Sequence, residues 1–327
     1  MHRHHIRVLV TALLMLLAAE GLTAVAEPRL GSPQVWPTDA LQHKSEQIAA
    51  AGHRELVILG SSAAAFGVDP EVMTAATPGH PLVYNAGVPY GRPEVMSVVY
   101  ERLVSPLLEP RYAIVELLPH TNLPTPDEGF YEALIDSVGV RSTDDGPSLL
   151  KFASRSALFR NRPTLRDPVL TLRALVRDTQ TSIEGMSASG FMTPPDDTFR
   201  FDSGARSLLA SMLGSVTDED LGAGLEELNR LLDSIEQTDA EPALLIMPVY
   251  DEVYFSVDAG IRAVWETFLE SVRQMAAERG IAILDPRDLG WVEADFVDPT
   301  HLSRRGAERL SRWLANEVGR LLDAPEG

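Results

Sequence analysis

The chain has 327 residues, of which 45% are hydrophobic and 23% are charged, so it can bury a sizeable core. Its formal net charge of -19 argues against a nucleic-acid partner, because binding to phosphates needs a concentrated basic surface. The sequence contains no cysteine, which excludes disulfides, thiolate catalysis and metal sites with cysteine ligands.

The first 26 residues have the pattern of an export signal. A basic start precedes an apolar stretch at residues 8–19, and Ala24-Val25-Ala26 offers a small-x-small cleavage site. The stretch is shorter than the ~20 apolar residues that span a bilayer, and Glu20 interrupts it. Two alternatives stay open: a cleaved signal peptide, or a retained membrane anchor over residues 6–26. Both predict an exported body, either periplasmic or extracellular.

Residues 27–54 are predicted to form a proline-rich tether and then a helix at residues 40–52. The body opens with the unbroken aliphatic run Leu56-Val57-Ile58-Leu59, which is typical of a strand covered on both faces in a parallel sheet. The run stops at Gly60-Ser61-Ser62. Open α/β sheets bind their ligands beyond the carboxyl ends of the strands, so a serine at this place can be a nucleophile.

Strands and helices then alternate along the chain. Further strands are predicted at residues 81–87, 112–118, 243–249 and 281–284, and helices at residues 70–77, 92–105, 218–237, 259–279 and 303–322, with Pro106 ending the second of these helices. Such alternation implies βαβ units, a parallel sheet and helices on both of its faces. We therefore predict one α/β domain over residues 55–327, with a helical insertion at about residues 119–224 between the third and fourth strands.

The predicted insertion contains a basic amphipathic segment at residues 148–178, in an otherwise acidic protein. Seven Lys and Arg residues fall within it. One interpretation is a basic face over an anionic substrate or a membrane surface. The other is a solvated helix face that pairs with neighbouring acids, which is the more common role of such charge runs.

A second candidate for chemistry lies near the C-terminus. Asp298 and His301 are three residues apart, Pro299 stiffens the turn between them, and Ser303 is placed to cap the following helix. A serine is a weak nucleophile until a base removes its proton, and an acid must orient that base. Asp298 and His301 supply both functions if they face Ser62. Otherwise they are a loop residue and a surface histidine.

Three blocks occur in an order that resembles the SGNH/GDSL hydrolase superfamily. They are Gly60-Ser61-Ser62 after the first strand, Asn85-Ala86-Gly87 after the second, and Asp298-x-x-His301 before the last helix. The resemblance covers about residues 55–118 and 243–322. It implies a three-layer α/β/α sandwich with a central parallel sheet, of the SGNH/flavodoxin-like kind, and an esterase, a lipase or a carbohydrate acyl-processing enzyme.

The resemblance also implies the catalytic roles. Ser62 matches the family's nucleophile, whereas Ser61 stands where the family usually has an aspartate. His301 would be the general base, and Asp298 the acid that orients it.

The oxyanion hole is likewise implied by the resemblance. The backbone N–H groups of Ser62 and Gly87 match two of its donors. The family's third block has a Gly-x-Asn-Asp motif, whereas residues 118–122 of this chain lack its glycine and its aspartate. Asn122 is the nearest match to the donor asparagine, and His120 is an alternative donor. Asn85 either braces its loop or touches the substrate.

Together these features predict an exported serine esterase that removes O-acyl groups, with acetyl as one candidate, from a carbohydrate or small ester. Two alternatives stay open. One is an O-acyltransferase acting on cell-envelope polysaccharide or exopolysaccharide through the same acyl-enzyme, and the other is a non-catalytic, SGNH-like glycan-binding protein. The sequence contains no HExxH motif, calcium loop or glycine-rich phosphate loop, so we expect no metal and no cofactor.

Overall fold

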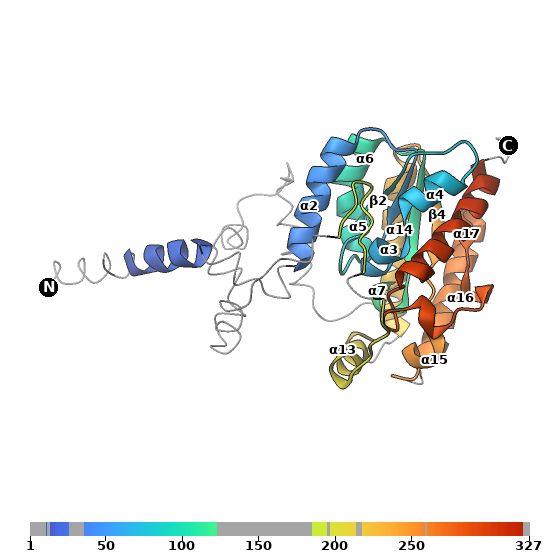
Figure 1. The fold of residues 1–327 in the computed structure, drawn as a ribbon. Helices are drawn as coiled ribbons and strands as arrows, with labels where there is room; N and C mark the ends of the chain where they lie inside the picture. The colour runs from blue at the N-terminus through green and yellow to red at the C-terminus, as the bar shows by residue number, and fades with distance from the viewer. Residues whose placement is uncertain are drawn as a thin grey trace. The chain divides into compact units, whose positions relative to one another are not determined.

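The computed structural model describes residue 11 and residues 14–25, 36–122, 185–194, 197–213, 218–258 and 260–322 (Figure 1). The chain divides into two compact units, residues 1–39 with 132–184, and residues 40–131 with 185–327. The tether at residues 27–35, the basic segment at 148–178 and most of the predicted insertion lie outside the described residues.

The larger unit is built on a parallel sheet of five strands within the described residues. They are β1 (Leu56–Leu59), β2 (Val83–Asn85), β3 (Tyr112–Leu117), β4 (Glu241–Ile246) and β5 (Ala282–Leu284), in the spatial order β2-β1-β3-β4-β5. Each neighbouring pair is parallel, with Ile58 of β1 aligned to Ile114 of β3. The chain reverses its direction of travel across the sheet at β1, and ligands of such sheets bind at this switch point.

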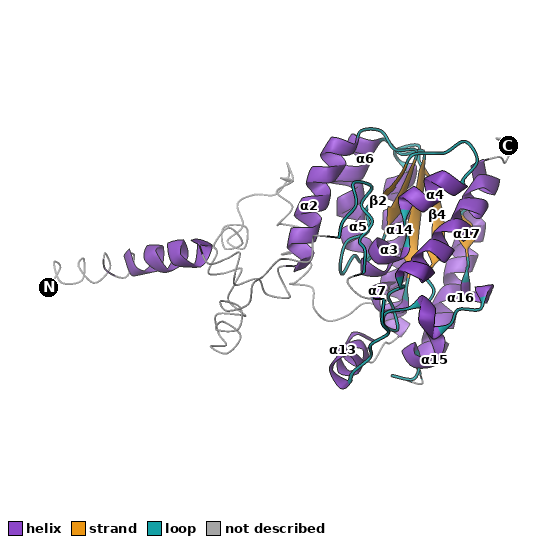
Figure 2. Ribbon diagram, viewed as in Figure 1, coloured by secondary structure: helices purple, strands orange, loops and turns teal. Residues whose placement is uncertain are grey.

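Helices cover both faces of the sheet (Figure 2). One face carries α3 (Ser62–Gly67), α4 (Pro70–Ala76) and α17 (Arg304–Leu322), and the other carries α5 (Pro93–Val99), α14 (Asp218–Glu236) and α16 (Ile261–Arg279). The buried residues of α17 recur every three or four positions, as in Leu310 and Leu314, which pack on the strands. The predicted fold class, a three-layer α/β/α sandwich with a parallel sheet, is confirmed.

The helix α2 (Trp36–Ala51) precedes the sheet, and the predicted strands and helices recur with shifted bounds. Residues 62–67, for which no helix was predicted, form the short helix α3. The predicted fourth strand extends to residue 249, but β4 ends at Ile246, which is paired with Leu117, the last residue of β3.

Pro106 does not end the helix that contains it, so this prediction was wrong. A wider π-helical turn at Tyr100–Val104 joins α5 to α6 (Ser105–Leu108), and Pro106 lies in the first turn of α6, where its missing N–H is tolerated. The helix ends instead at Glu109, which adopts the left-handed conformation at φ 47°.

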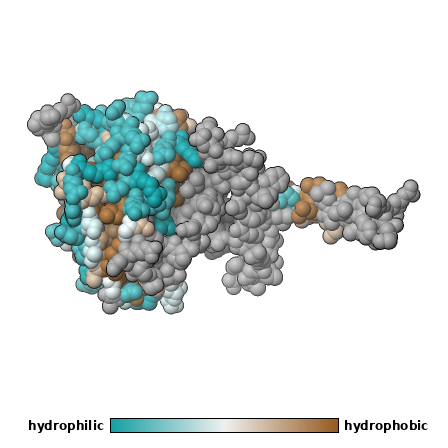
Figure 3. Space-filling view, turned by 180° about the vertical axis from the view of Figure 1, so that it is seen from behind, coloured by the Kyte–Doolittle hydropathy of each residue, from teal (hydrophilic) through white to brown (hydrophobic). Residues whose placement is uncertain are grey.

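The surfaces of the two units differ in polarity. Seen from behind, the described surface of the larger unit is mostly hydrophilic (Figure 3). In the smaller unit, residues 14–25 are helical and expose the large apolar side chains of Leu14, Met15, Leu16, Leu17, Leu22 and Val25. None of the helices in the described residues combines the length and the apolarity needed to cross a bilayer.

Candidate active site

The turn that joins β1 to α3, residues 60–64, is here called the Ser62 turn. Ser61 is the N-cap of α3, and its Oγ accepts the N–H of Ala63 at 3.1 Å. Oε2 of Glu116 accepts the N–H groups of Ser61 at 3.0 Å and Ala64 at 2.8 Å. The N–H of Ser62 has no acceptor in the described part of the chain. One donor beside the Ser62 hydroxyl is therefore left for a ligand.

The loop before α17 brings His301 and Asp298 to Ser62. His301 Nε2 lies 2.8 Å from Ser62 Oγ, and His301 Nδ1 lies 2.7 Å from Asp298 Oδ2. In the neutral ring, Nδ1–H donates to the carboxylate and Nε2 accepts from the serine hydroxyl, which is the tautomer a general base needs. The His301 side chain is 26% exposed, so solvent and small ligands reach it.

The Asp298 carboxylate is held rigidly by its own loop. Its Oδ1 accepts bonds from the N–H of Thr300 at 2.8 Å, the Thr300 hydroxyl at 2.9 Å and the N–H of His301 at 2.9 Å. Ser303 Oγ accepts the N–H of Gly306 at 3.3 Å, as expected of a cap for α17. The local D-x-x-H sequence thus builds its own geometry, since most of these contacts span three residues or fewer.

Asp298 and His301 shift each other's pKa in opposite directions. Burial alone would raise the pKa of Asp298, but the charge and hydrogen bond of His301 and two backbone N–H groups hold it far below its usual range. Burial alone would lower the pKa of His301. The charge and hydrogen bond of Asp298, with a smaller effect of the Glu116 charge, raise it above its ordinary value.

The loop after β2 is braced by Asn85. The fully buried Asn85 donates from Nδ2 to the carbonyls of Ala64 at 2.8 Å and Val68 at 2.7 Å, and its Oδ1 accepts the N–H of Gly87 at 2.9 Å. Of the two roles considered for Asn85, the structure shows the brace. Because Asn85 holds the N–H of Gly87, that N–H is not available to a substrate oxygen in this conformation.

Gly87 instead contributes through its size. A Cβ at this position would lie 2.9 Å from the backbone nitrogen of Ala65 and 3.0 Å from the carbonyl oxygen of Ser61. Only a glycine lets the loop pass this close to the Ser62 turn.

The loop after β3 forms the short helix α7 (Pro119–Asn122). Asn122 is buried and its Oδ1 accepts the N–H of Leu118 at 2.6 Å, while its Nδ2 has no partner among the described residues. His120 Nδ1 lies 3.0 Å from the hydroxyl of Tyr254. Burial and then the charge of His301 lower the pKa of His120 to about 3, so its ring is neutral. The side chains of Asn122 and His120 each retain a nitrogen that can donate a hydrogen bond to a ligand.

Two site-forming residues were missed by the sequence analysis. Lys44 of α2 is fully buried, and its Nζ donates to the carbonyls of Asn85 at 2.7 Å and Gly190 at 2.8 Å. Its position between Leu41 and Ile48 on one helix face was the available signal. Glu116 is the one acidic residue of β3, which was the available signal, but the sequence of the strand does not indicate which groups its carboxylate bonds.

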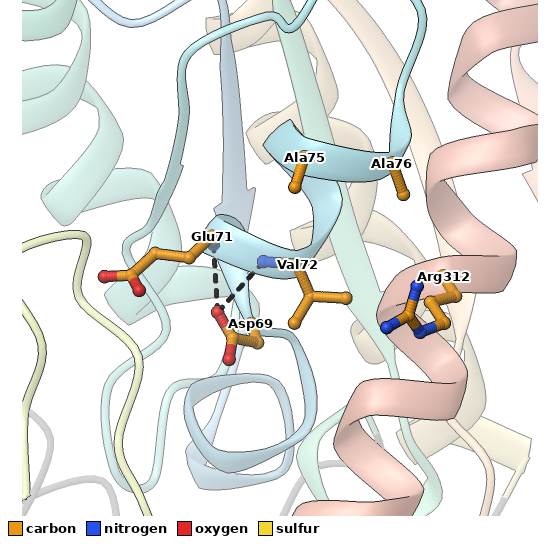
Figure 4. A pocket seen from close by; sticks show the side chains of 6 residues that line it. All are labelled: Asp69, Glu71, Val72, Ala75, Ala76 and Arg312. Atoms are coloured by element: carbon orange, nitrogen blue, oxygen red, sulfur yellow. Dashed lines mark hydrogen bonds between the residues drawn. The ribbon is translucent and has the colours of Figure 1, made fainter.

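A pocket of about 320 Å³ lies between α4 and α17, away from these residues (Figure 4). Its lining residues are Asp69, Glu71, Val72, Ala75, Ala76 and Arg312. The Asp69 side chain that borders it caps α4 by accepting the N–H groups of Glu71 and Val72. None of the predicted site residues lines this pocket.

No protein-family model matches the chain, and no curated protein matches it. Among solved structures, the chain is similar to a crystal structure from Bacteroides fragilis NCTC 9343 that is described as a "putative acylhydrolase". The match covers 86% of this chain and 96% of that chain, with 9% sequence identity and a TM-score of 0.44.

Proposed function

We propose that the protein is an exported serine ester hydrolase of the GDSL/SGNH type, with Ser62 as the nucleophile. The observation that carries the proposal is the line of hydrogen bonds from Ser62 Oγ to His301 Nε2 at 2.8 Å, and from His301 Nδ1 to Asp298 Oδ2 at 2.7 Å. A nucleophile, a base and an orienting acid in this order activate a serine towards acyl transfer, whatever the fold that carries them.

In the proposed reaction, Ser62 Oγ attacks the carbonyl carbon of the ester while its proton moves to His301 Nε2. The protonated imidazole then gives this proton to the alcohol oxygen as the carbon–oxygen bond breaks, which leaves an acyl-enzyme. Water attacks the acyl-enzyme with His301 again as the base, and the carboxylic acid departs. Asp298 stays ionised throughout and stabilises the imidazolium in both steps.

The negative charge that develops on the carbonyl oxygen needs hydrogen-bond donors. The unpaired N–H of Ser62 is the first donor that we propose, and the unpaired Nδ2 of the buried Asn122 is the second. Donors fixed before the reaction stabilise the oxyanion without reorganising, which is why each is worth about 10²–10³ in rate.

The substrate class and the location of the enzyme come from the sequence. The resemblance at residues 55–118 and 243–322 supports an O-acyl ester of a carbohydrate or small alcohol, with acetyl as one candidate. The export pattern in residues 1–26 supports a periplasmic or extracellular site of action, with the segment either cleaved or retained as an anchor.

The proposal is tested with a fluorophosphonate probe and p-nitrophenyl acetate. We expect the wild-type protein to be labelled and to release p-nitrophenol, and Ser62→Ala to abolish both. Ser61→Ala separates the two serines: it removes the helix cap and the hydroxyl partner of Glu116 but leaves the proposed nucleophile, so labelling should slow without being abolished. Labelling that survives in Ser62→Ala would overturn the assignment.

Two other results would change the reaction class. Acylated oligosaccharide in excess of free acid, when a sugar acceptor is supplied, would indicate acyl transfer in place of hydrolysis. A folded protein that binds polysaccharide but reacts neither with the fluorophosphonate probe nor with p-nitrophenyl acetate would support the non-catalytic alternative.

A further inference from the structure

Glu116 is a buried acid that the proposed reaction does not use. It is fully buried in the middle of the sheet, where β3 lies between β1 and β4. No Lys or Arg pairs with it in the described part of the chain. Since an unpaired buried carboxyl group is costly, its hydrogen-bond partners must compensate.

All of these partners belong to the Ser62 turn. Glu116 Oε2 accepts the N–H groups of Ser61 and Ala64, at 3.0 Å and 2.8 Å, and Oε1 lies 2.6 Å from Ser61 Oγ. Gly60 makes room for this contact, because a Cβ there would lie 2.5 Å from Glu116 Oε2. The carboxyl group thus holds both ends of the turn and leaves the N–H of Ser62 as its unpaired donor.

We propose that Glu116 is a positioning residue for this site: its carboxyl group accepts two N–H groups of the Ser62 turn and holds that turn in its reactive shape. The negative charge of this carboxyl group also favours the protonated form of His301. The inference rests on the proposed function and adds to it a second acid, which acts through the turn and does not touch the substrate.

Glu116 can hold the Ser62 turn, a role here called the Glu116 brace, whether its carboxyl group is charged or protonated. When the group is charged, the Ser61 hydroxyl donates to Oε1. When it is protonated, Oε1–H donates to Ser61 Oγ, and Oε2 accepts the same two N–H groups in either state. Burial raises the pKa of Glu116 to about 7 against the opposing effect of its hydrogen bonds to Ser61 and Ala64. The charge can therefore change near neutral pH while the geometry is kept.

The titratable groups around His301 come from three elements. Asp298, on its own loop, raises the pKa of His301 most, and Glu116 of β3 adds to this effect. His120 of α7 is neutral at these pH values. Glu116 is therefore the group whose charge can be removed without touching the triad.

The test uses Glu116→Gln and Glu116→Leu in the full chain. The glutamine oxygen can accept both N–H groups and its amide can donate to Ser61 Oγ, so this variant removes the charge and keeps the brace. We expect the pKa of His301, followed by NMR and assigned with His301→Ala, to fall below its value in the wild-type protein. The acid limb of kcat/KM should move to lower pH by the same amount.

Glu116→Leu removes the brace as well and leaves two N–H groups unpaired. We expect kcat to fall about 10²-fold with little change in KM, because small displacements of a nucleophile cost this much. Glu101→Gln is the matched control, since this side chain is exposed, bonds Ser234 and should alter neither measurement. If Glu116→Leu fails to fold, Ser61→Ala tests the contact instead, because it removes the hydroxyl that bonds Glu116 Oε1, and Glu116→Gln still tests the charge.

The inference is overturned if Glu116→Leu folds and keeps the kcat of the wild-type protein, and its electrostatic part is overturned if Glu116→Gln leaves the pKa of His301 and the pH profile unchanged. It is also overturned if both variants lower only the melting temperature. The NMR titration needs no activity, so it tests Glu116 even if the wild-type protein proves inert to the ester and the probe. Inertness of the wild-type protein would count against the proposed function alone.

Discussion

His301 Nε2 lies 2.8 Å from Ser62 Oγ, although 239 residues separate the two in the chain. Ser62 begins α3 directly after β1, and His301 ends the loop that enters α17. Both helices cover the same face of the sheet, and α17 contacts α3. The packing of these two helices therefore sets the distance on which the proposed reaction depends.

Asp298→Asn tests the orienting acid. The amide cannot stabilise the imidazolium and favours the wrong tautomer of His301, so we expect kcat to fall by about 10⁴-fold with the protein still folded. The rate of p-nitrophenyl acetate hydrolysis is the measurement. Asp285→Asn is the matched control, because Asp285 pairs with Arg287 near the surface, and its rate should stay within about twofold of wild type. A nearly unchanged rate in Asp298→Asn would exclude the proposed triad.

The pH dependence of hydrolysis tests the general base. Only the neutral form of His301 accepts the Ser62 proton, so kcat/KM should rise with pH and level off above the pKa of His301. That pKa is raised by Asp298, so the midpoint should lie above the ordinary histidine value of about 6.5. Asp298, with its lowered pKa, stays ionised over the measured range of roughly pH 5 to 9. A profile that is flat or falls over this range would contradict the assignment.

Asn122→Ala tests the second oxyanion donor. If Nδ2 meets the oxyanion, kcat should fall by about 10²–10³ while KM changes little. The lost bond to the N–H of Leu118 also lowers stability, so thermal unfolding is measured in parallel. His120→Ala separates the alternative donor, and a larger rate loss there would transfer the role to His120.

Lys44→Met tests the brace behind the loop after β2. Methionine keeps the volume but leaves the carbonyls of Asn85 and Gly190 without their donor, so the free energy of unfolding should fall by about 1–3 kcal/mol. Urea unfolding measures this change. Glu46→Gln, on an exposed position of the same helix, should stay within about 0.5 kcal/mol of wild type. Equal stability of Lys44→Met and wild type would show that Lys44 does not hold this loop.

Local patterns were sufficient for most of the fold. The unbroken apolar run at β1, and the run at β3 that only Glu116 interrupts, predicted buried parallel strands, and the spacing along α17 predicted a helix with one buried face. These predictions succeed because backbone hydrogen bonding and side-chain periodicity act over a few residues. The helix α3 was not predicted, because one of the acceptors at its first turn is Glu116, 52 residues beyond Ala64.

The sequence by itself determined the element order, the parallel sheet, and a rigid loop in which Asp298 and His301 are three residues apart. Only the tertiary structure decided which groups meet at the site. It brought His301 to Ser62, placed Asn85 against the carbonyls of Ala64 and Val68, and placed Glu116 beneath the Ser62 turn. The physical reason is that a buried polar group must find a partner, and which partner lies within about 3 Å depends on how distant elements pack.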